Sequence, residues 1–148
     1  MADGSKLMRD AMTRNFVMHV PHNHALALEP LEIGKAVARF KLPWAPHLVG
    51  NPDTGVLHGG AITAMLDACC GAAVFAALSE LKPIATLDLR IDYLKAAEPG
   101  RSVFGRARCY KLTRNVAFTR AVAYQDGIDD VVAHAVGTFM LSTKQGKA

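Results

Sequence analysis

The chain has 148 residues, of which 51% are apolar and 20% are charged, so its composition is that of a folded protein rather than a disordered one. A chain of this length can bury a hydrophobic core without disulfides or metal ions, and we expect one domain over residues 1–148. The net charge of +4 is too small to predict nucleic-acid binding by itself.

Residues 1–22 are predicted to form a short polar arm that is partly helical. This arm contains no apolar run of the kind that a secretory signal needs. His19, His22 and His24 cluster at its end, but no carboxylate or cysteine stands close enough in sequence to complete a metal site. We therefore expect no metal ion here.

A β-hairpin is predicted next, with strands over residues 25–31 and 36–42 and a turn at residues 32–34. The stretch 43–57 follows. It contains three prolines and two glycines and is expected to be a long irregular loop.

A long helix is predicted over residues 58–80 from its length and its alanine content. Its apolar residues lie on every side, which is typical of a helix that is almost completely enclosed. The segment is long enough to cross a membrane, but Asp67 stands in its middle, where a charge is costly in lipid. We expect a buried helix and no membrane span.

Strands separated by short turns are predicted for the rest of the chain, over residues 84–94, 103–112, 116–124 and 131–141. Consecutive strands with short connections form antiparallel sheets. The predicted fold class is therefore α+β: an antiparallel sheet of about five to six strands wrapped around one long buried central helix.

The start of the helix is the first candidate for chemistry. Backbone N–H groups in a first helical turn lack partners and carry the positive end of the helix dipole. Gly59 and Gly60 would let another atom approach these N–H groups closely. Such a terminus can stabilise a carbonyl oxygen that gains negative charge, although the glycines could equally serve close packing or a tight turn.

Asp67 is the second candidate. It is the only charged residue between Asp53 and Glu80, and no Lys or Arg occurs between Lys41 and Lys82. A buried carboxylate without a partner is costly, and such groups are frequent at functional sites. A hydrogen bond from a neighbouring strand is the structural alternative.

Gly59 and Asp67 are eight residues apart, which is about 12 Å along one helix. An oxyanion donor and a base that act on one carbonyl must both lie within about 3–4 Å of the reacting centre. If both residues serve one reaction, they come from two copies of the chain. The spacing therefore predicts a homodimer with two equivalent sites at its interface.

These residues resemble a known family. Asn51, the run His58-Gly59-Gly60, Asp67 and the later segment TLDLRIDYLKAAEPG are similar to the hotdog-fold acyl-CoA thioesterases. The nearest branch is that of the phenylacetic-acid-degradation thioesterases, in the 4-hydroxybenzoyl-CoA thioesterase superfamily. The resemblance covers about residues 25 to 142 and implies a sheet around a central helix, paired into dimers and dimers of dimers.

The resemblance also implies roles for single residues. The Gly59 N–H would polarise the thioester carbonyl, and Gly60 would belong to the same substrate-binding turn. Asp67 of the partner chain would activate water or attack the carbonyl. Asn51 would help to position the carbonyl or the water, and His58 would hold the site in shape. Thr86 would be a polar neighbour of the acid.

Basic residues are concentrated between Lys82 and Arg120, where nine of them face three acidic residues. Coenzyme A carries several phosphate charges that Arg or Lys could bind. Arg90, Lys95 and Arg114 are the candidates for this role. The segment lacks the interleaved aromatic residues of a nucleic-acid-binding sheet, and nucleic acid is not expected as a partner.

The sequence contains no phosphate loop and no dinucleotide fingerprint, so no cofactor is expected. Its three cysteines, two of them adjacent, form no disulfide framework and indicate reduced thiols in a cytoplasmic protein. The leading hypothesis is hydrolysis of an acyl-CoA thioester. The alternatives are a non-catalytic acyl-CoA-binding or sensor protein, and a hydratase or dehydratase of the same fold that uses His58.

Overall fold

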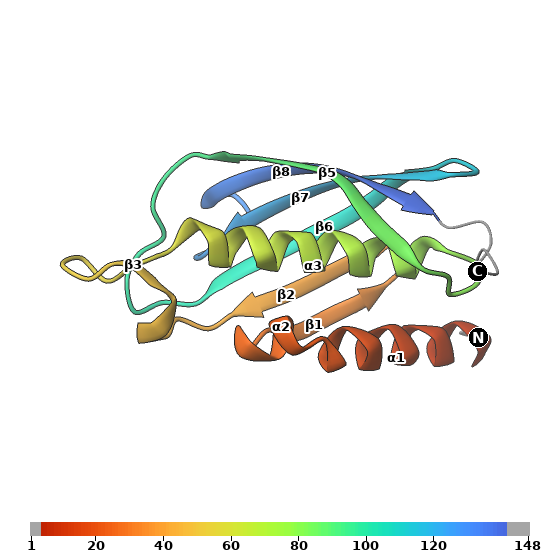
Figure 1. Cartoon of the computed structure of the whole chain (residues 1–148), viewed down its shortest axis with the longest axis horizontal. Helices are drawn as coiled ribbons and strands as arrows, with labels where there is room; N and C mark the ends of the chain where they lie inside the picture. The colour runs from red at the N-terminus through yellow and green to blue at the C-terminus, as the bar shows by residue number, and fades with distance from the viewer. Residues whose placement is uncertain (1–3, 142–148) are drawn as a thin grey trace, which may run out of the picture.

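A six-stranded antiparallel sheet curls around one long helix in the computed structural model, which describes residues 4–141 (Figure 1). The strand order is β1-β2-β6-β7-β8-β5. The strands are β1 (Glu29–Gly34), β2 (Val37–Leu42), β5 (Ile84–Tyr93), β6 (Val103–Leu112), β7 (Val116–Tyr124) and β8 (Val131–Leu141). This is the predicted fold class, and the last three strands have the predicted bounds.

The central helix α3 (Gly59–Ala77) packs on the concave side of the sheet, mainly against β6, β2 and β7. Its alanines and glycines let it approach the strands closely. At Gly105 on β6, a Cβ atom would lie 3.1 Å from the Cε atom of Met65, so a larger residue there would require the Met65 side chain to shift. Met65 and Leu66 on this side of α3 are completely buried.

The expectation that α3 is almost completely enclosed was wrong. One stripe of the helix, which includes Gly60, Ala64, Asp67 and Gly71, is left half-buried or exposed. The sheet covers one side of α3, and a single curled sheet of this width does not close around the other side. By length and composition α3 could cross a membrane, but ten of its residues are buried inside the protein.

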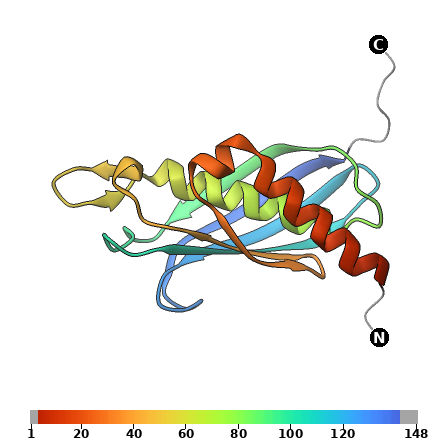
Figure 2. The same cartoon turned by 90° about the horizontal axis from the view of Figure 1, so that it is seen from below.

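Two N-terminal helices lie beside α3 (Figure 2). Helix α1 (Gly4–His19) and the short helix α2 (Pro21–Ala25) contact α3, and α1 also contacts β1. Thr13 and Val17, one helical turn apart on α1, are buried. Residues 4–25 thus pack against the central helix instead of extending from the fold; the first three residues lie outside the described part of the chain.

The first hairpin differs from the sequence prediction. The turn falls at Lys35 and Ala36, whose φ angles are 53° and 61°, and Gly34 pairs directly with Val37. Positive φ angles at both central residues define a type I′ turn, whose twist matches that of the flanking strands. The predicted turn at residues 32–34 is part of β1, and the first half of the predicted strand 25–31 belongs to α2 and the connection after it.

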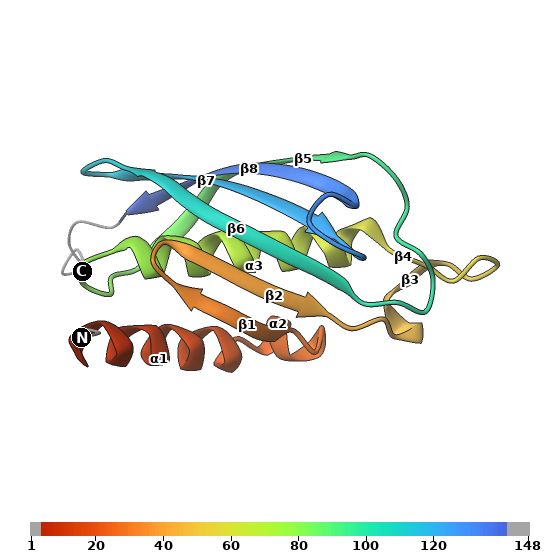
Figure 3. The same ribbon diagram turned by 180° about the vertical axis from the view of Figure 1, so that it is seen from behind.

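The predicted irregular loop 43–57 also contains regular structure. It holds the 3₁₀ helix η1 (Pro46–Leu48) and a small hairpin of β3 (Val49–Asn51) and β4 (Val56–Leu57). This hairpin projects from the end of the molecule at which α3 begins (Figures 1 and 3). It leads the chain directly into the first turn of α3.

Candidate active site

The first turn of α3 is fixed by His58, which occupies the N-cap position in an extended conformation. Its Nδ1 atom accepts a hydrogen bond of 2.8 Å from the Gly60 N–H. Its own N–H donates to the Leu48 carbonyl oxygen at 2.8 Å, which ties the helix start to η1. A cap of this kind satisfies one of the N–H groups that a helix start leaves without a partner.

Gly59 follows the cap, and its N–H makes no hydrogen bond within residues 4–141. Its carbonyl oxygen accepts a hydrogen bond of 2.6 Å from the Tyr93 hydroxyl, which in turn accepts one of 2.6 Å from Thr63. A Cβ atom at position 59 would lie 3.3 Å from the Tyr93 hydroxyl oxygen, so the site favours glycine. The structure therefore presents a free Gly59 N–H at the start of α3, and the Tyr93 hydroxyl holds the carbonyl group of the same residue in place.

Tyr93 was missed by the sequence analysis. It lies on β5, 34 residues after Gly59, and half of it is exposed. A tyrosine at the end of a strand carries no pattern that links it to a distant helix start, so no sequence signal could have found this contact.

Asp67 lies two turns further along α3. The Thr86 hydroxyl on β5 donates a hydrogen bond of 2.9 Å to its Oδ1 atom. Asp67 is half-buried, so the expectation of a buried carboxylate without a partner was wrong: the partner is the neighbouring strand. The structure does bring Thr86 and Asp67 together, and Oδ2 makes no hydrogen bond within the described residues.

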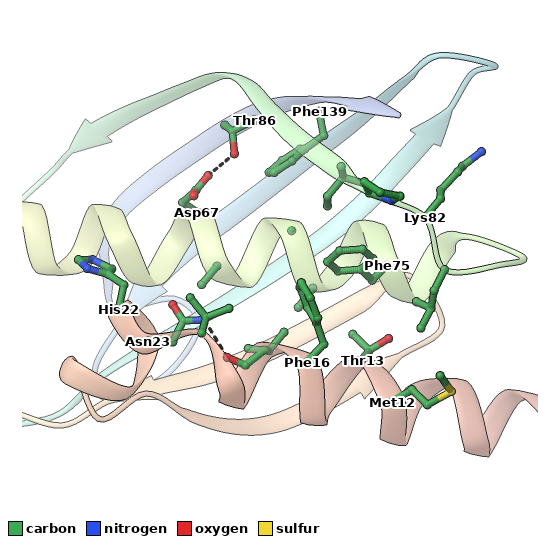
Figure 4. Close-up of a pocket in the computed structure, with 18 of the residues that line it drawn as sticks. Met12, Thr13, Phe16, His22, Asn23, Asp67, Phe75, Lys82, Thr86 and Phe139 are labelled. Atoms are coloured by element: carbon green, nitrogen blue, oxygen red, sulfur yellow. Dashed lines mark hydrogen bonds between the residues drawn. The ribbon is translucent and has the colours of Figure 1, made fainter. Parts of the chain in front are cut away.

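A cavity of about 810 Å³ contains this pair at one end (Figure 4). It lies over the open stripe of α3, between α1, α2 and the beginning of β5. Most of its lining is apolar, with contributions from Met12, Phe16, Val17, Val20, Ala64, Ala68, Gly71, Ala72, Phe75, Leu81, Pro83, Ile84 and Phe139. Figure 4 shows Asp67 and Thr86 facing each other, with Phe16 and Phe75 further along the helix. Such a cavity can hold a long apolar group whose polar end lies at the carboxylate.

Asn51 is not brought to this cavity. It lies in the β3–β4 hairpin, where its Oδ1 atom accepts a hydrogen bond of 3.0 Å from the Asp53 N–H. Its carbonyl oxygen accepts another of 2.8 Å from the Gly55 N–H. The side chain thus stabilises the turn of this hairpin within its own chain. Gly60 is exposed at the helix start, where its N–H donates a hydrogen bond to His58. Neither Gly60 nor His58 lines the cavity.

The three candidate phosphate ligands are also separated. Arg90 forms an exposed ion pair of 3.2 Å with Asp92 on its own strand. Lys95 forms an ion pair with Asp130 and thereby lowers the pKa of that carboxyl group. Arg114 lies in the β6–β7 turn, next to β6 residues that border the last turn of α3. It is therefore at the opposite end of α3 from Gly59 in the same chain.

Much of the remaining basic charge is on the outer face of the sheet. Arg39 pairs directly with Arg106 across β2 and β6, and Arg108 pairs with Arg120 across β6 and β7. The Arg120 guanidinium group lies 4.6 Å from the centre of the Tyr110 ring. Figure 3 shows this side of the sheet, which faces away from α3. The basic stretch of the sequence is therefore not gathered around the cavity.

The cysteines are free and buried, as predicted. Burial raises the pKa of the Cys70 thiol to about 12, and it also raises the pKa of Cys69 and of Cys109. All three thiols are therefore protonated at neutral pH, and a protonated thiol is a poor nucleophile. Within residues 4–141 no three His, Cys, Asp or Glu side chains are grouped in a way that could hold a metal ion.

The fold and these residues define a hotdog protein with an acid beside an apolar cavity. Residues 54–132 match the family model of the thioesterase superfamily. Because this match covers more than half of the chain, the protein belongs to the thioesterase superfamily.

One curated relative is the medium/long-chain acyl-CoA thioesterase YigI of Salmonella typhimurium. It is 37% identical over 99 residues, which cover 58% of this chain and 62% of that protein. The match therefore spans less than two thirds of the relative.

Solved structures match over a larger share of the chain. A crystal structure of a Pseudomonas aeruginosa protein is 41% identical, covers 89% of this chain and 98% of its own, and superposes with a TM-score of 0.81. The phenylacetic acid degradation protein PaaI of Thermus thermophilus is 26% identical, with coverage of 81% and 97% and a TM-score of 0.72. The predicted family resemblance is confirmed.

Proposed function

We propose that the protein hydrolyses acyl-CoA thioesters to a free acid and coenzyme A. The observation that carries this proposal is the position of Asp67: a carboxylate with one free oxygen, held by Thr86 at one end of an apolar cavity. Membership of the thioesterase superfamily and the similarity to YigI support the same reaction. The apolar cavity would take the acyl group, and the acid would face its thioester end.

The reaction needs a second copy of the chain. Gly59 and Asp67 are separated by about 12 Å along the axis of α3, so one helix cannot bring both to one carbonyl. The proposed site therefore joins Asp67 of one protomer with the backbone N–H of the partner's Gly59. Two such sites would form in a dimer with a two-fold axis.

Strand β5 supports this pairing. Within residues 4–141 it is the last strand of the sheet and pairs with β8 alone, so its other edge has unpaired backbone groups. Leu87 on this strand is 53% exposed. An uncovered, partly apolar edge strand favours pairing with another strand. We propose a homodimer through this edge, with dimers of dimers as the larger assembly.

In the proposed reaction, Asp67 accepts a proton from a water molecule as that water attacks the thioester carbonyl carbon. The carbonyl oxygen becomes an oxyanion, which accepts a hydrogen bond from the N–H of the partner's Gly59. The C–S bond then breaks, coenzyme A leaves as the thiolate, and a proton returns to its sulfur. The products are the free carboxylic acid and the thiol.

Asp67 could instead attack the carbonyl directly and form an anhydride that water then cleaves. A single turnover in ¹⁸O-labelled water separates the two routes. General-base catalysis places the label in the fatty acid, whereas an anhydride opened at the Asp67 carbonyl places it in the protein.

The substitution Asp67→Asn tests the proposal, because it keeps the shape of the side chain and removes the base. We expect the rate of thiol release from acyl-CoA to fall about 10²–10⁴-fold. The matched control is Asp129→Asn, an exposed carboxylate in the β7–β8 connection that does not line the cavity. If the wild type releases no thiol, a non-catalytic acyl-CoA-binding protein is the better interpretation; if Asp67→Asn keeps full activity, the assigned role is wrong.

His58 gives no support to a hydratase. Its Nδ1 atom is engaged by the Gly60 N–H, and the residue does not line the cavity. The cytoplasmic location belongs to the proposal as well, supported by three free thiols within the described residues.

A further inference from the structure

The cavity over α3 exists because one stripe of the helix carries very small side chains. Four small residues of α3 line the cavity, and their spacing places them on one face of the helix. They are Ala64, Ala68, Gly71 and Ala72. A Cβ atom added at Gly71 would meet Ile84 and Phe139 only at 3.8 Å, an ordinary contact distance. Gly71 therefore leaves space that the packing of the helix does not require.

Helix α1 forms the wall opposite the sheet. It contributes Met12, Thr13, Phe16 and Val17 to the lining. The Phe16 ring stands edge-on to the Phe75 ring of α3, with 5.4 Å between ring centres and 72° between planes. Phe16 is nonetheless 58% exposed and Met12 is 50% exposed. Large apolar side chains that are exposed at the wall of an apolar cavity favour the binding of an apolar group.

We propose that α1 is one wall of an acyl-chain channel and that the acyl chain runs from Asp67 to the Phe16–Phe75 pair. This inference rests on the proposed function, because it places the thioester at Asp67. From Asp67 to Phe75 the helix rises eight residues, or about 12 Å. That length fits an extended medium-chain aliphatic acyl group better than a short or a compact aromatic one.

The distribution of polar groups gives the channel a direction. Asp67 and Thr86 lie at one end, and His22 lies across from them on α2 (Figure 4). The amide of Asn23, which also lines this end, donates to the Val17 carbonyl oxygen at 3.0 Å and so is already engaged. Between this end and Phe75 the lining is apolar apart from the Thr13 hydroxyl, and the charged Lys82 lines the cavity beyond Phe75 (Figure 4). An acyl chain would therefore bind with its carboxyl-derived carbon at Asp67 and its methyl end at the phenylalanines.

The test compares chain-length profiles. Each methylene that enters an apolar channel strengthens binding about fourfold, so KM should fall from butanoyl-CoA to medium chains and then level off. Gly71→Leu would fill the middle of the channel. We expect it to keep butanoyl-CoA hydrolysis within about threefold of wild type and to lose at least tenfold in kcat/KM for dodecanoyl-CoA.

Phe16→Ala is the second variant. Phe16 is exposed, so this substitution does not alter the packing of the hydrophobic core. It should raise KM for dodecanoyl-CoA severalfold and raise KM for butanoyl-CoA by a smaller factor. Met8→Ala is the matched control, because Met8 is also an exposed apolar residue of α1 but does not line the cavity. Its profile should equal that of wild type. Gly71→Ala fits the available space, and its kcat/KM for dodecanoyl-CoA should lie between that of wild type and that of Gly71→Leu.

Binding of dodecanoic acid, followed as a rise in Tm, separates this inference from the proposed function. Hydrolysis with the same chain-length profile in wild type, Gly71→Leu and Phe16→Ala overturns the channel and leaves the thioesterase reaction intact. Absence of hydrolysis, together with a Tm rise that Gly71→Leu abolishes and Met8→Ala keeps, overturns the reaction and supports the channel. Equal Tm rises in all variants also overturn the channel.

Discussion

The Thr86 hydroxyl donates to Asp67 across the gap between strand β5 and helix α3, with 2.9 Å between the two oxygen atoms. This bond holds one carboxylate oxygen and leaves the other free, so it selects one orientation of the acid. It also ties the reacting residue of the central helix to the edge strand through which we propose that two chains pair.

Thr86→Val should reduce kcat about 10–100-fold, because the hydrogen bond joins a hydroxyl to a charged group and orients it. KM should stay nearly constant, since Val has the shape of Thr. Thr86→Ser should recover most of the lost kcat. Steady-state kinetics on the three proteins check this; a change in KM alone would assign Thr86 to substrate binding.

His58→Ala should lower the free energy of unfolding by about 1 kcal/mol, because the Gly60 N–H loses its cap. His58→Asn should restore most of that stability, since Asn is among the best N-cap residues. Urea unfolding measures both effects. If His58 were an acid–base group, both variants would lose activity equally; as a cap, His58→Asn should remain close to wild type in kcat.

Tyr93→Phe should affect the first turn of α3. It removes the hydroxyl that donates to the Gly59 carbonyl and accepts from Thr63. We expect a loss of about 1 kcal/mol in stability and a fall in kcat, because the free Gly59 N–H is less firmly positioned. Tyr110→Phe is the control, as Tyr110 lies on the outer face of the sheet and packs on Arg120. Denaturation and kinetics on the pair should separate local from general effects.

Stability should fall at alkaline pH because of the buried thiols. In the unfolded chain Cys70 would ionise near its ordinary pKa of 9.0, whereas burial raises its pKa to about 12 in the folded protein. The folded state therefore holds more protons above pH 9, and the contribution of this thiol is lost as pH rises towards 12. Each buried thiol of this kind lowers the free energy of unfolding by up to about 1.4 kcal/mol for each pH unit between its two pKa values.

Urea unfolding between pH 8 and pH 10.5 measures this slope. Cys70→Ala should make the slope shallower, although a small cavity lowers its stability at every pH. An unchanged slope would show that other groups cause the alkaline loss.

The strands after α3 could be predicted because their alternation is regular. On β8, Ala133, Ala135 and Phe139 are buried and His134 and Val136 are exposed, as the period of two requires. The first hairpin could not be predicted in the same way. Type I′ turns are normally signalled by Asn-Gly or Asp-Gly, and Lys35-Ala36 carries no such signal.

The site was predictable in part for a similar reason. Gly59 and Asp67 stand out in an apolar helix. The family resemblance placed Thr86 near the acid, and a hydrogen bond from a neighbouring strand was the structural alternative for Asp67. The contributions of Phe16 and Tyr93 depend on contacts between residues 59 and 34 positions apart in sequence. Such contacts arise from the tertiary fold, and neither residue belongs to a local pattern that would announce them.

The separation of Gly59 and Asp67 along one rigid helix has a consequence for the protein at low abundance. If each site draws one group from each of two chains, a dissociated chain has no complete site at all, whatever its stability. Turnover per molecule would then decline on dilution below the dissociation constant of the pair. The copy number in a cell would determine whether working centres assemble, as well as how many there are.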